Sequence, residues 1–389
     1  MKTLRIAIIT NILPKYREGF YDALFRRTDV NVHIYCQEKI PGADPETIHE
    51  KYGGKVTLLK YLSARQEKIA VQFIPWIRIL SESDVIFIGG NPRVVSDALF
   101  GTLLTFMGKK VVLWTMARSF RNNRLSERIR LRWSRIFRHI LVYTDEEAEY
   151  LMQRGFKKNY VLGINNGLDQ NAIEYAASNW PLIELNEWRR DEGIDGRVLI
   201  LSCARLERKN RLDLVAEALP ILISRVPNLI WCVIGSGPEL PELKAMVDSL
   251  GVNDHVRFVG GLYEEKELAP WFMSSKLLVH PAAVGLSLLH AFGYGLPVIV
   301  NDNPRSHGPE YAAFRCGSTG LAFRKDDVKH LADTIIKMLE DDRARIMMGE
   351  IARSLARNKY NVDIMVERFI RIARDAYGEL RVGDIMADE

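Results

Sequence analysis

The chain of 389 residues has few cysteines and no long apolar run. Its cysteines show neither the spacing of a metal site nor that of a disulfide framework, so a reducing compartment is expected. They are Cys36, Cys203, Cys232 and Cys316. No apolar stretch approaches the ~20 residues of a membrane-spanning helix. The start, MKTLRIAIIT, lacks the small-residue cleavage site of a signal peptide, and it predicts a first strand over Leu4–Thr10.

The excess of one sign of charge over the other is also small. The formal net charge is only +5, which suits a surface that meets anionic lipid or phosphate but decides nothing by itself. Apolar residues make up 47% of the chain and charged residues 26%, so a folded protein is expected rather than a disordered one. The length exceeds that of one ordinary core and suits two domains.

The first half alternates apolar strands with amphipathic helices such as 19–27 and 94–106. This alternation predicts a parallel sheet covered on both faces. The strands are expected at 4–10, 30–36, 56–61, 84–88, 110–114, 140–144 and 160–164. Ligands of such sheets bind beyond the carboxyl ends of the strands, which directs attention to the loops at 11–18, 89–93 and 115–123.

Two of these loops carry candidate contacts for an acceptor or a phosphate. The loop NILPKYREGF offers Arg17 and Gly19, and the loop GGNPR offers Asn91 and Arg93. Each loop could equally be a plain turn with exposed charges.

An arginine-rich helix is predicted over 118–138. Apolar residues from Leu125 to Ile140 fall on one side of it, and this side is expected to pack on the sheet. Five arginines share the other side: Arg124, Arg128, Arg132, Arg135 and Arg138. That side is either a solvated face or a surface for anionic membrane lipid or a lipid-linked phosphate.

The second half restarts the strand and helix alternation after a polar connection. The predicted domains are 1–170, a linker at 171–196, a second domain at 197–360, and a final helix with its tail at 361–389. Gly235 and Gly237 follow a strand, as in a dinucleotide-binding turn. Leu240 stands where the third glycine would be, and no acidic residue ends the next strand, so a dinucleotide fold is rejected.

The stretch from His280 to Asp302, HPAAVGLSLLHAFGYGLPVIVND, resembles the donor-sugar motif of family 4 retaining glycosyltransferases. That motif has a proline, then E-G-F-G-L, E-A-M-A and G-x-P-V. Seven positions match: Gly285, Leu286, Leu289, Ala291, Gly295, Pro297 and Val298. Both motif glutamates are replaced, the first by Ala282 and the second by His290.

The resemblance implies the GT-B fold, an α/β fold in which two doubly wound Rossmann-like domains face a cleft and the last helix crosses back to the first domain. Arg205 and Lys209 match the R-L-x-x-K-G motif that holds the nucleotide diphosphate, and Asn210 stands for its glycine. Gly285, Leu286, His290 and Glu310 are implied donor contacts. The loops after neighbouring strands add three more, Gly235, Gly237 and Tyr263.

The resemblance also implies the function. A retaining glycosyltransferase without a metal or other cofactor is expected, and it would move a sugar from a nucleotide diphosphate-sugar to an acceptor, such as a lipid-linked saccharide of surface polysaccharide or glycan synthesis. The expected location is cytoplasmic, at the inner face of the membrane if the arginine side binds lipid, and no nucleic-acid partner is expected. Two alternatives stay open: a nucleotide-sugar epimerase or hydrolase of the same fold, and an inactive binding subunit.

Overall fold

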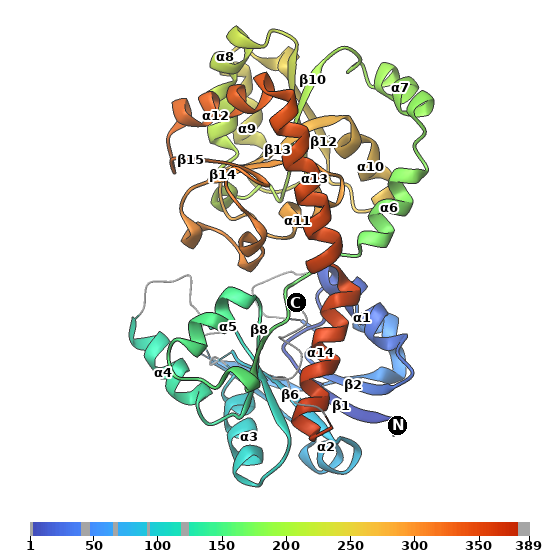
Figure 1. Cartoon of the computed structure of the whole chain (residues 1–389), viewed down its shortest axis with the longest axis vertical. Helices are drawn as coiled ribbons and strands as arrows, with labels where there is room; N and C mark the ends of the chain where they lie inside the picture. The colour runs from blue at the N-terminus through green and yellow to red at the C-terminus, as the bar shows by residue number, and fades with distance from the viewer. Residues whose placement is uncertain (1–2, 40–46, 65–68, 92–93, 118–123, 380–389) are drawn as a thin grey trace. The chain divides into compact units, whose positions relative to one another are not determined.

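The computed structural model describes residues 3–39, 47–64, 69–91, 94–117 and 124–379. The chain forms two compact units (Figure 1). Unit 1 comprises Met1–Asn166 and Val362–Glu389, and unit 2 comprises Gly167–Asn361. Each unit contains one parallel sheet, as the apolar strands predicted.

The sheet of unit 1 has seven parallel strands. Their spatial order is β3 (Val56–Leu58), β2 (Val30–Cys36), β1 (Leu4–Ile9), β6 (Val85–Gly89), β7 (Val111–Trp114), β8 (His139–Val142) and β9 (Val161–Gly163). A separate antiparallel pair, β4 (Tyr61–Ala64) and β5 (Ile69–Gln72), was not predicted from the sequence.

Helices cover both faces of this sheet because alternate strand residues point to opposite sides. In β1, Leu4, Ile6 and Ile8 belong to one buried cluster, whereas Ala7 and Ile9 belong to another. The helices of unit 1 are α1 (Glu18–Phe25), α2 (Trp76–Glu82), α3 (Val95–Phe106), α4 (Arg124–Ser134), α5 (Asp145–Met152) and α14 (Val362–Tyr377).

The last helix, α14, packs against α1 and the central strands of unit 1 (Figure 1). Phe369 stacks on Phe87 of β6 with ring centroids 4.1 Å apart. The Nε of Arg368 donates to the carbonyl of Gly163 at 2.6 Å, and Arg374 pairs with Asp29 at 2.9 Å. The predicted return of the last helix to the first domain is confirmed.

Unit 2 repeats the plan with six parallel strands. Their spatial order is β12 (Val256–Gly260), β11 (Leu229–Ile234), β10 (Val198–Cys203), β13 (Ser275–His280), β14 (Val298–Asn301) and β15 (Gly320–Phe323). Its helices are α6 (Gln170–Ser178), α7 (Leu182–Asp191), α8 (Asp213–Arg225), α9 (Leu240–Ser249), α10 (Glu265–Ser274), α11 (Leu286–Gly293), α12 (Val328–Glu340) and α13 (Asp342–Lys359).

The region predicted as a linker, 171–196, differs from that expectation. It holds α7 and most of α6, and both helices pack on α10 within unit 2. The polar composition reflects their solvent faces, since Ile173, Ala176 and Leu185 are buried. The Asp169 side chain caps α6 by accepting a hydrogen bond from the amide of Ala172 at 3.0 Å.

Candidate functional site

The order of the strands in unit 2 places its switch point between β10 and β13. From β10 the chain proceeds to β11 on one side, whereas β13 and β14 lie on the other side. The loops that follow β10 and β13 therefore diverge at this point, and in open parallel sheets such an edge is where ligands bind. Arg205 and Lys209 follow β10, and Gly285 follows β13.

Arg205 and Lys209 are exposed cations that share one carboxylate. Glu207 lies 3.5 Å from Arg205 and 2.5 Å from Lys209, and the two cationic side chains keep 71% and 65% of their surface exposed. Ion pairs this exposed are weak, so an anionic ligand can displace the carboxylate at little cost. The two cations are available to a diphosphate.

Asn210, which replaces the glycine of the motif, holds this loop in shape. Its buried amide donates to the carbonyl of Arg205 at 2.6 Å, and its backbone N–H donates to the carbonyl of Glu207 at 2.9 Å. The next residue, Arg211, takes the left-handed conformation with φ 54°. The loop is thus fixed from behind while the two cations point outward.

The glycines after β11 are explained by close backbone packing. A Cβ at Gly235 would lie 1.9 Å from the carbonyl oxygen of Ala204, and one at Gly237 would lie 2.3 Å from that of Leu206. The amide of Leu206 donates to the carbonyl of Ser236 at 2.9 Å. These glycines therefore let the loop after β11 pack against the loop that carries Arg205 and Lys209. Their contact with a donor stays a prediction.

The turn before α11 is built from two segments that are distant in sequence. The amide of Ala283 donates to Ser306 at 2.9 Å, and that of Gly308 donates to Val284 at 2.7 Å. A Cβ at Gly285 would lie 3.6 Å from Oε2 of Glu310, so these two predicted residues do lie together at the start of α11. Leu286 is the first residue of α11, where backbone amides are not used by the helix itself.

His307 and Asn301, which were not predicted as site residues, lock this turn. The Val284 amide donates to Nδ1 of His307 at 3.3 Å, and Nε2 of His307 donates to the carbonyl of Asn301 at 3.0 Å. Burial lowers the pKa of His307 to about 4, so the ring is neutral at pH 7, as both bonds require. The Asn301 amide donates to the carbonyl of Pro281 at 2.5 Å.

His290 lies on α11 and is bonded to a carboxylate from another helix. Its Nε2 donates to Oε1 of Glu265 at 2.8 Å, and the Tyr294 hydroxyl donates to the same oxygen at 2.6 Å. Burial acts to raise the pKa of Glu265, but the bonds from His290 and Tyr294 hold it below its ordinary value. The motif has a glutamate at this position of α11. In this chain the carboxylate comes instead from Glu265 of α10, which is hydrogen-bonded to His290. Tyr263 is 68% exposed two residues before Glu265.

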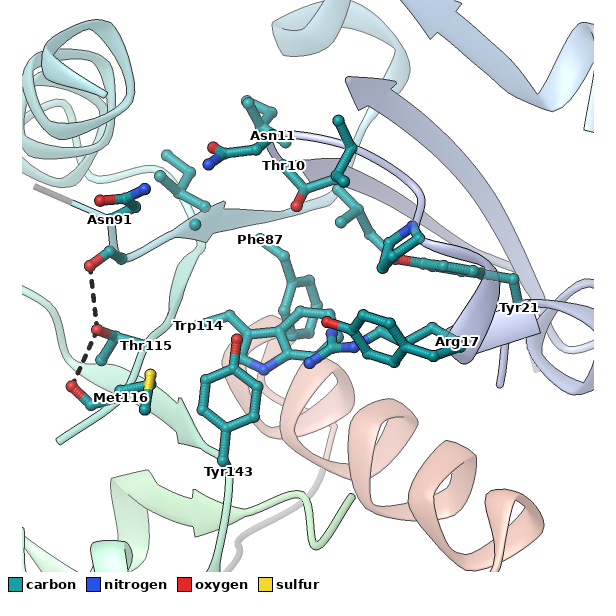
Figure 2. Close-up of a pocket in the computed structure, with 18 of the residues that line it drawn as sticks. Thr10, Asn11, Arg17, Tyr21, Phe87, Asn91, Trp114, Thr115, Met116 and Tyr143 are labelled. Carbon is teal, nitrogen blue, oxygen red and sulfur yellow. Dashed lines mark hydrogen bonds between the residues drawn. The ribbon is translucent and has the colours of Figure 1, made fainter. Parts of the chain in front are cut away.

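Unit 1 has its own switch point, between β1 and β6, and a pocket of about 590 Å³ lies there (Figure 2). Residues at the carboxyl ends of β1, β6, β7 and β8 line it. Among them are Thr10, Asn11, Arg17, Gly89, Gly90, Asn91, Trp114, Thr115 and Tyr143. A Cβ at Gly90 would lie 2.2 Å from Cβ of Thr115, so only glycine lets the two loops meet.

The predicted loop residues of unit 1 have different positions. Arg17 and Asn91 line the pocket. Gly19 lies in the first turn of α1, close to the predicted start of that helix, and its contact with an acceptor stays a prediction. Arg93 lies outside the described residues.

Arg17 extends over aromatic rings in this pocket (Figure 2). Its guanidinium carbon lies 4.8 Å from the centre of the Trp114 ring and 5.3 Å from that of Tyr143. Burial opposes its charge, but nearby tyrosine hydroxyls favour it, and the pKa of Arg17 stays above its ordinary value. The guanidinium is therefore charged.

Trp114, Tyr143 and Arg130 are pocket residues that the sequence argument missed. Arg130 reaches the pocket from α4 and donates to the carbonyl of Met116 at 3.3 Å. Burial lowers its pKa, while Glu147 and Glu127 act in the opposite direction. Its place outside the predicted arginine stripe was a usable signal, because it had to face a different surface from Arg128 and Arg132.

The arginine stripe is only partly helical. The helix α4 ends at Ser134, residues 118–123 lie outside the described residues, and nothing is described of the Arg124 side chain. Four of the five arginines are exposed: Arg128, Arg132, Arg135 and Arg138. Arg135 and Arg138 lie beyond the helix, with their guanidinium groups over the rings of Phe156 and Tyr160 respectively. Ile129, predicted on the packed side, is 58% exposed, and Ile140 belongs to β8. The end of the helix at Ser134 explains the placement of Arg135, Arg138 and Ile140, which lie beyond it, whereas it does not explain the exposure of Ile129 inside α4.

Within the described residues, none of the helices combines the length and apolar character needed to cross a membrane. In that same part of the chain, no three histidine, cysteine, aspartate or glutamate side chains are grouped in a way that could hold a metal ion.

Comparisons with known proteins agree with this geometry. Residues 185–355 match the family model described as Glycosyl transferases group 1, which is less than half of the chain. A GDP-mannose-dependent alpha-(1-6)-phosphatidylinositol monomannoside mannosyltransferase of Mycolicibacterium smegmatis is 29% identical over 178 residues, 43% of this chain and 45% of that protein. The chain thus matches about half the length of the curated relatives.

Solved structures extend the likeness across both units. Anabaena HepE in complex with UDP has a TM-score of 0.69 at 16% identity, covering 95% of this chain and 99% of that one. A glycosyltransferase from Rickettsia africae has a TM-score of 0.73 at 12% identity, covering 98% and 100%. At such identities the likeness concerns the fold, and the predicted GT-B fold of two Rossmann-like domains is confirmed. The match to the family Glycosyl transferases group 1 lies over residues 185–355, within unit 2.

Proposed function

We propose that this protein is a glycosyltransferase that moves a sugar from a nucleotide diphosphate-sugar, bound by unit 2, to an acceptor bound by unit 1. The observation that carries the proposal is the exposed pair Arg205 and Lys209 at the switch point of a group 1 glycosyltransferase domain. Glu310 beside Gly285 adds a hydrogen-bonding group at the start of α11.

The proposed chemistry follows from charge. When the bond between the sugar and the diphosphate breaks, negative charge grows on the distal phosphate and positive charge on the sugar carbon. Fixed cations and helix amides near that phosphate stabilise this state more than the ground state. Arg205, Lys209 and the amides at Gly285 and Leu286 suit this role, so the proposal includes no metal ion. Retention of the anomeric configuration is part of the same proposal.

The donor and acceptor classes are inferred from relatives. The Mycolicibacterium smegmatis relative is named for GDP-mannose and for a phosphatidylinositol monomannoside, and Anabaena HepE was solved with UDP. We therefore propose a UDP- or GDP-sugar donor and a saccharide acceptor on a lipid. A cytoplasmic location, with exposed Arg128 and Arg132 of α4 meeting anionic lipid at the membrane, belongs to the same proposal.

The test begins with binding. The melting temperature is measured with uridine, guanosine and adenosine diphosphates, and the diphosphate-sugars of the stabilising base are then tested for turnover with and without a lipid-linked saccharide. Turnover that requires the acceptor supports the proposal. Donor consumption without acceptor would instead identify an epimerase or hydrolase, and binding without turnover an inactive subunit. If none of the nucleotides raises the melting temperature, all three functions are refuted: transferase, epimerase or hydrolase, and nucleotide-binding subunit.

A further inference from the structure

The pocket of unit 1 contains two buried hydrogen-bond donors that no described residue satisfies. They are Nε of Arg17 and Nε1 of Trp114, and neither has a partner among the described residues. Unsatisfied donors of this kind are rare in folded proteins, because each loses its bonds to water and gains none in return. Both line the same pocket, where the Arg17 guanidinium lies over the Trp114 ring (Figure 2).

The charge of Arg17 is likewise unbalanced. Within the part of the chain that the structure describes, no carboxylate forms an ion pair with it, and the groups that raise its pKa are the hydroxyls of Tyr143, Tyr16 and Tyr21. Aromatic faces hold the guanidinium in place without neutralising it. A partly buried charge without a counter-charge is costly, so this arrangement is expected where a ligand supplies that counter-charge.

Arg130 adds a second guanidinium to the lining of this pocket. Glu147, one of two carboxylates that raise the pKa of Arg130, accepts hydrogen bonds from the backbone amides of Ala117 at 2.9 Å and Tyr143 at 3.1 Å. The pocket thus presents cationic and N–H donor groups on a partly apolar floor that includes Phe87.

We propose that this pocket binds a phosphate ester, with Arg17 as its anchor and the Trp114 indole N–H as a second donor. A phosphate offers several acceptor oxygens and one to two negative charges, which suits two guanidinium groups better than a single carboxylate does. The inference rests on the proposed function in one respect: the phosphate ester is then the anionic part of the acceptor.

The test uses phenyl phosphate as the probe and the full-length protein. Calorimetry compares wild type, Arg17→Gln, and Arg26→Gln as a matched control, since Arg17 precedes α1 and Arg26 is an exposed arginine that directly follows the same helix. Arg17→Gln should weaken binding about tenfold to a hundredfold, the size expected for a lost hydrogen bond between charged groups. Arg26→Gln should bind as wild type does. Equal affinity of all three proteins would overturn the proposal, and so would benzoate binding as tightly as phenyl phosphate.

A second measurement needs no arginine variant. In a titration of wild type with phenyl phosphate, the indole N–H resonance of Trp114 should shift, and the other six of the seven tryptophans provide an internal reference. Benzyl alcohol, which has no charge, should leave that resonance in place. A Trp114 resonance that is unmoved at saturating phenyl phosphate would overturn the proposal even if Arg17→Gln failed to fold.

Binding to vesicles distinguishes a lipid phosphate from a soluble phosphate ester. Arg17-dependent binding to phosphatidic acid vesicles, beyond that to phosphatidylcholine vesicles, would support the pocket and identify a lipid phosphate. Arg17-dependent binding of phenyl phosphate alone would support it and identify a soluble ester. Neither readout uses turnover, so a protein without transferase activity that still binds phosphate through Arg17 would refute the proposed function and leave this site standing.

Discussion

Arg205 and Lys209 provide a test that separates catalysis from folding. Their side chains are 71% and 65% exposed, and each pairs only with Glu207 in the described part of the chain. Exposed pairs contribute at most about 1 kcal/mol, so alanine at either position should lower the melting temperature by less than about 4 °C. A fixed charge that meets the developing phosphate charge is worth about 3–4 kcal/mol, so turnover should fall by about two to three powers of ten.

The assay is the release of nucleoside diphosphate from the preferred donor at saturating acceptor, with kcat and KM determined separately. Arg208→Ala is the matched control, because Arg208 is an exposed cation in the same short helix and is expected to keep wild-type kcat. Glu207→Gln removes the carboxylate that competes with the ligand, so it should tighten nucleoside diphosphate binding. Wild-type kcat in both alanine variants, or an equal loss in Arg208→Ala, would refute the reasoning.

Three further predictions concern stability and surface. Burial raises the pKa of Asp97 to about 7, above the unfolded value of 3.8, so folding stability should fall as pH rises from about 4 to 7. Asp97→Asn should remove that loss, worth up to about 4 kcal/mol at pH 8, in urea unfolding at pH 4 and pH 8; parallel curves for both proteins would contradict this. Ala283 has φ 53°, so Ala283→Gly should raise stability by up to about 1 kcal/mol, whereas Ala291→Gly inside α11 should lower it, as measured by thermal unfolding. Changing Arg128 and Arg132 to glutamate should abolish sedimentation with anionic vesicles at low salt without altering the melting temperature, and a wild type that ignores such vesicles would disprove membrane binding.

The sequence predicted the fold well because the signal was local. Continuous apolar strands such as β10 and β13, separated by amphipathic helices, are typical of a parallel sheet covered on both sides. The short polar helices α6 and α7 were mistaken for a linker because only one narrow side of each is buried. Composition averages over the faces of a helix and cannot show that side.

The site was predictable where a residue's role depends on its distance from a strand end. Arg205 and Lys209 follow β10 closely, and the strand order explains why they stand at the switch point. The bond between His290 and Glu265 was not predictable, since it joins helices 25 residues apart and depends on how α10 packs beside α11. The stacking of Arg17 on Trp114 likewise depends on the pairing of strands, which the sequence does not state.

The return of α14 sets an order of assembly during synthesis. Unit 2 is one continuous segment, Gly167–Asn361, so all of its contacts exist before the last helix is made. Unit 1 is different, because Phe369 fills the space beside Phe87 and Trp114. A chain growing from its amino end therefore exposes the apolar face of the first sheet until α14 emerges from the ribosome. The half of the protein that is translated first is the half that is completed last.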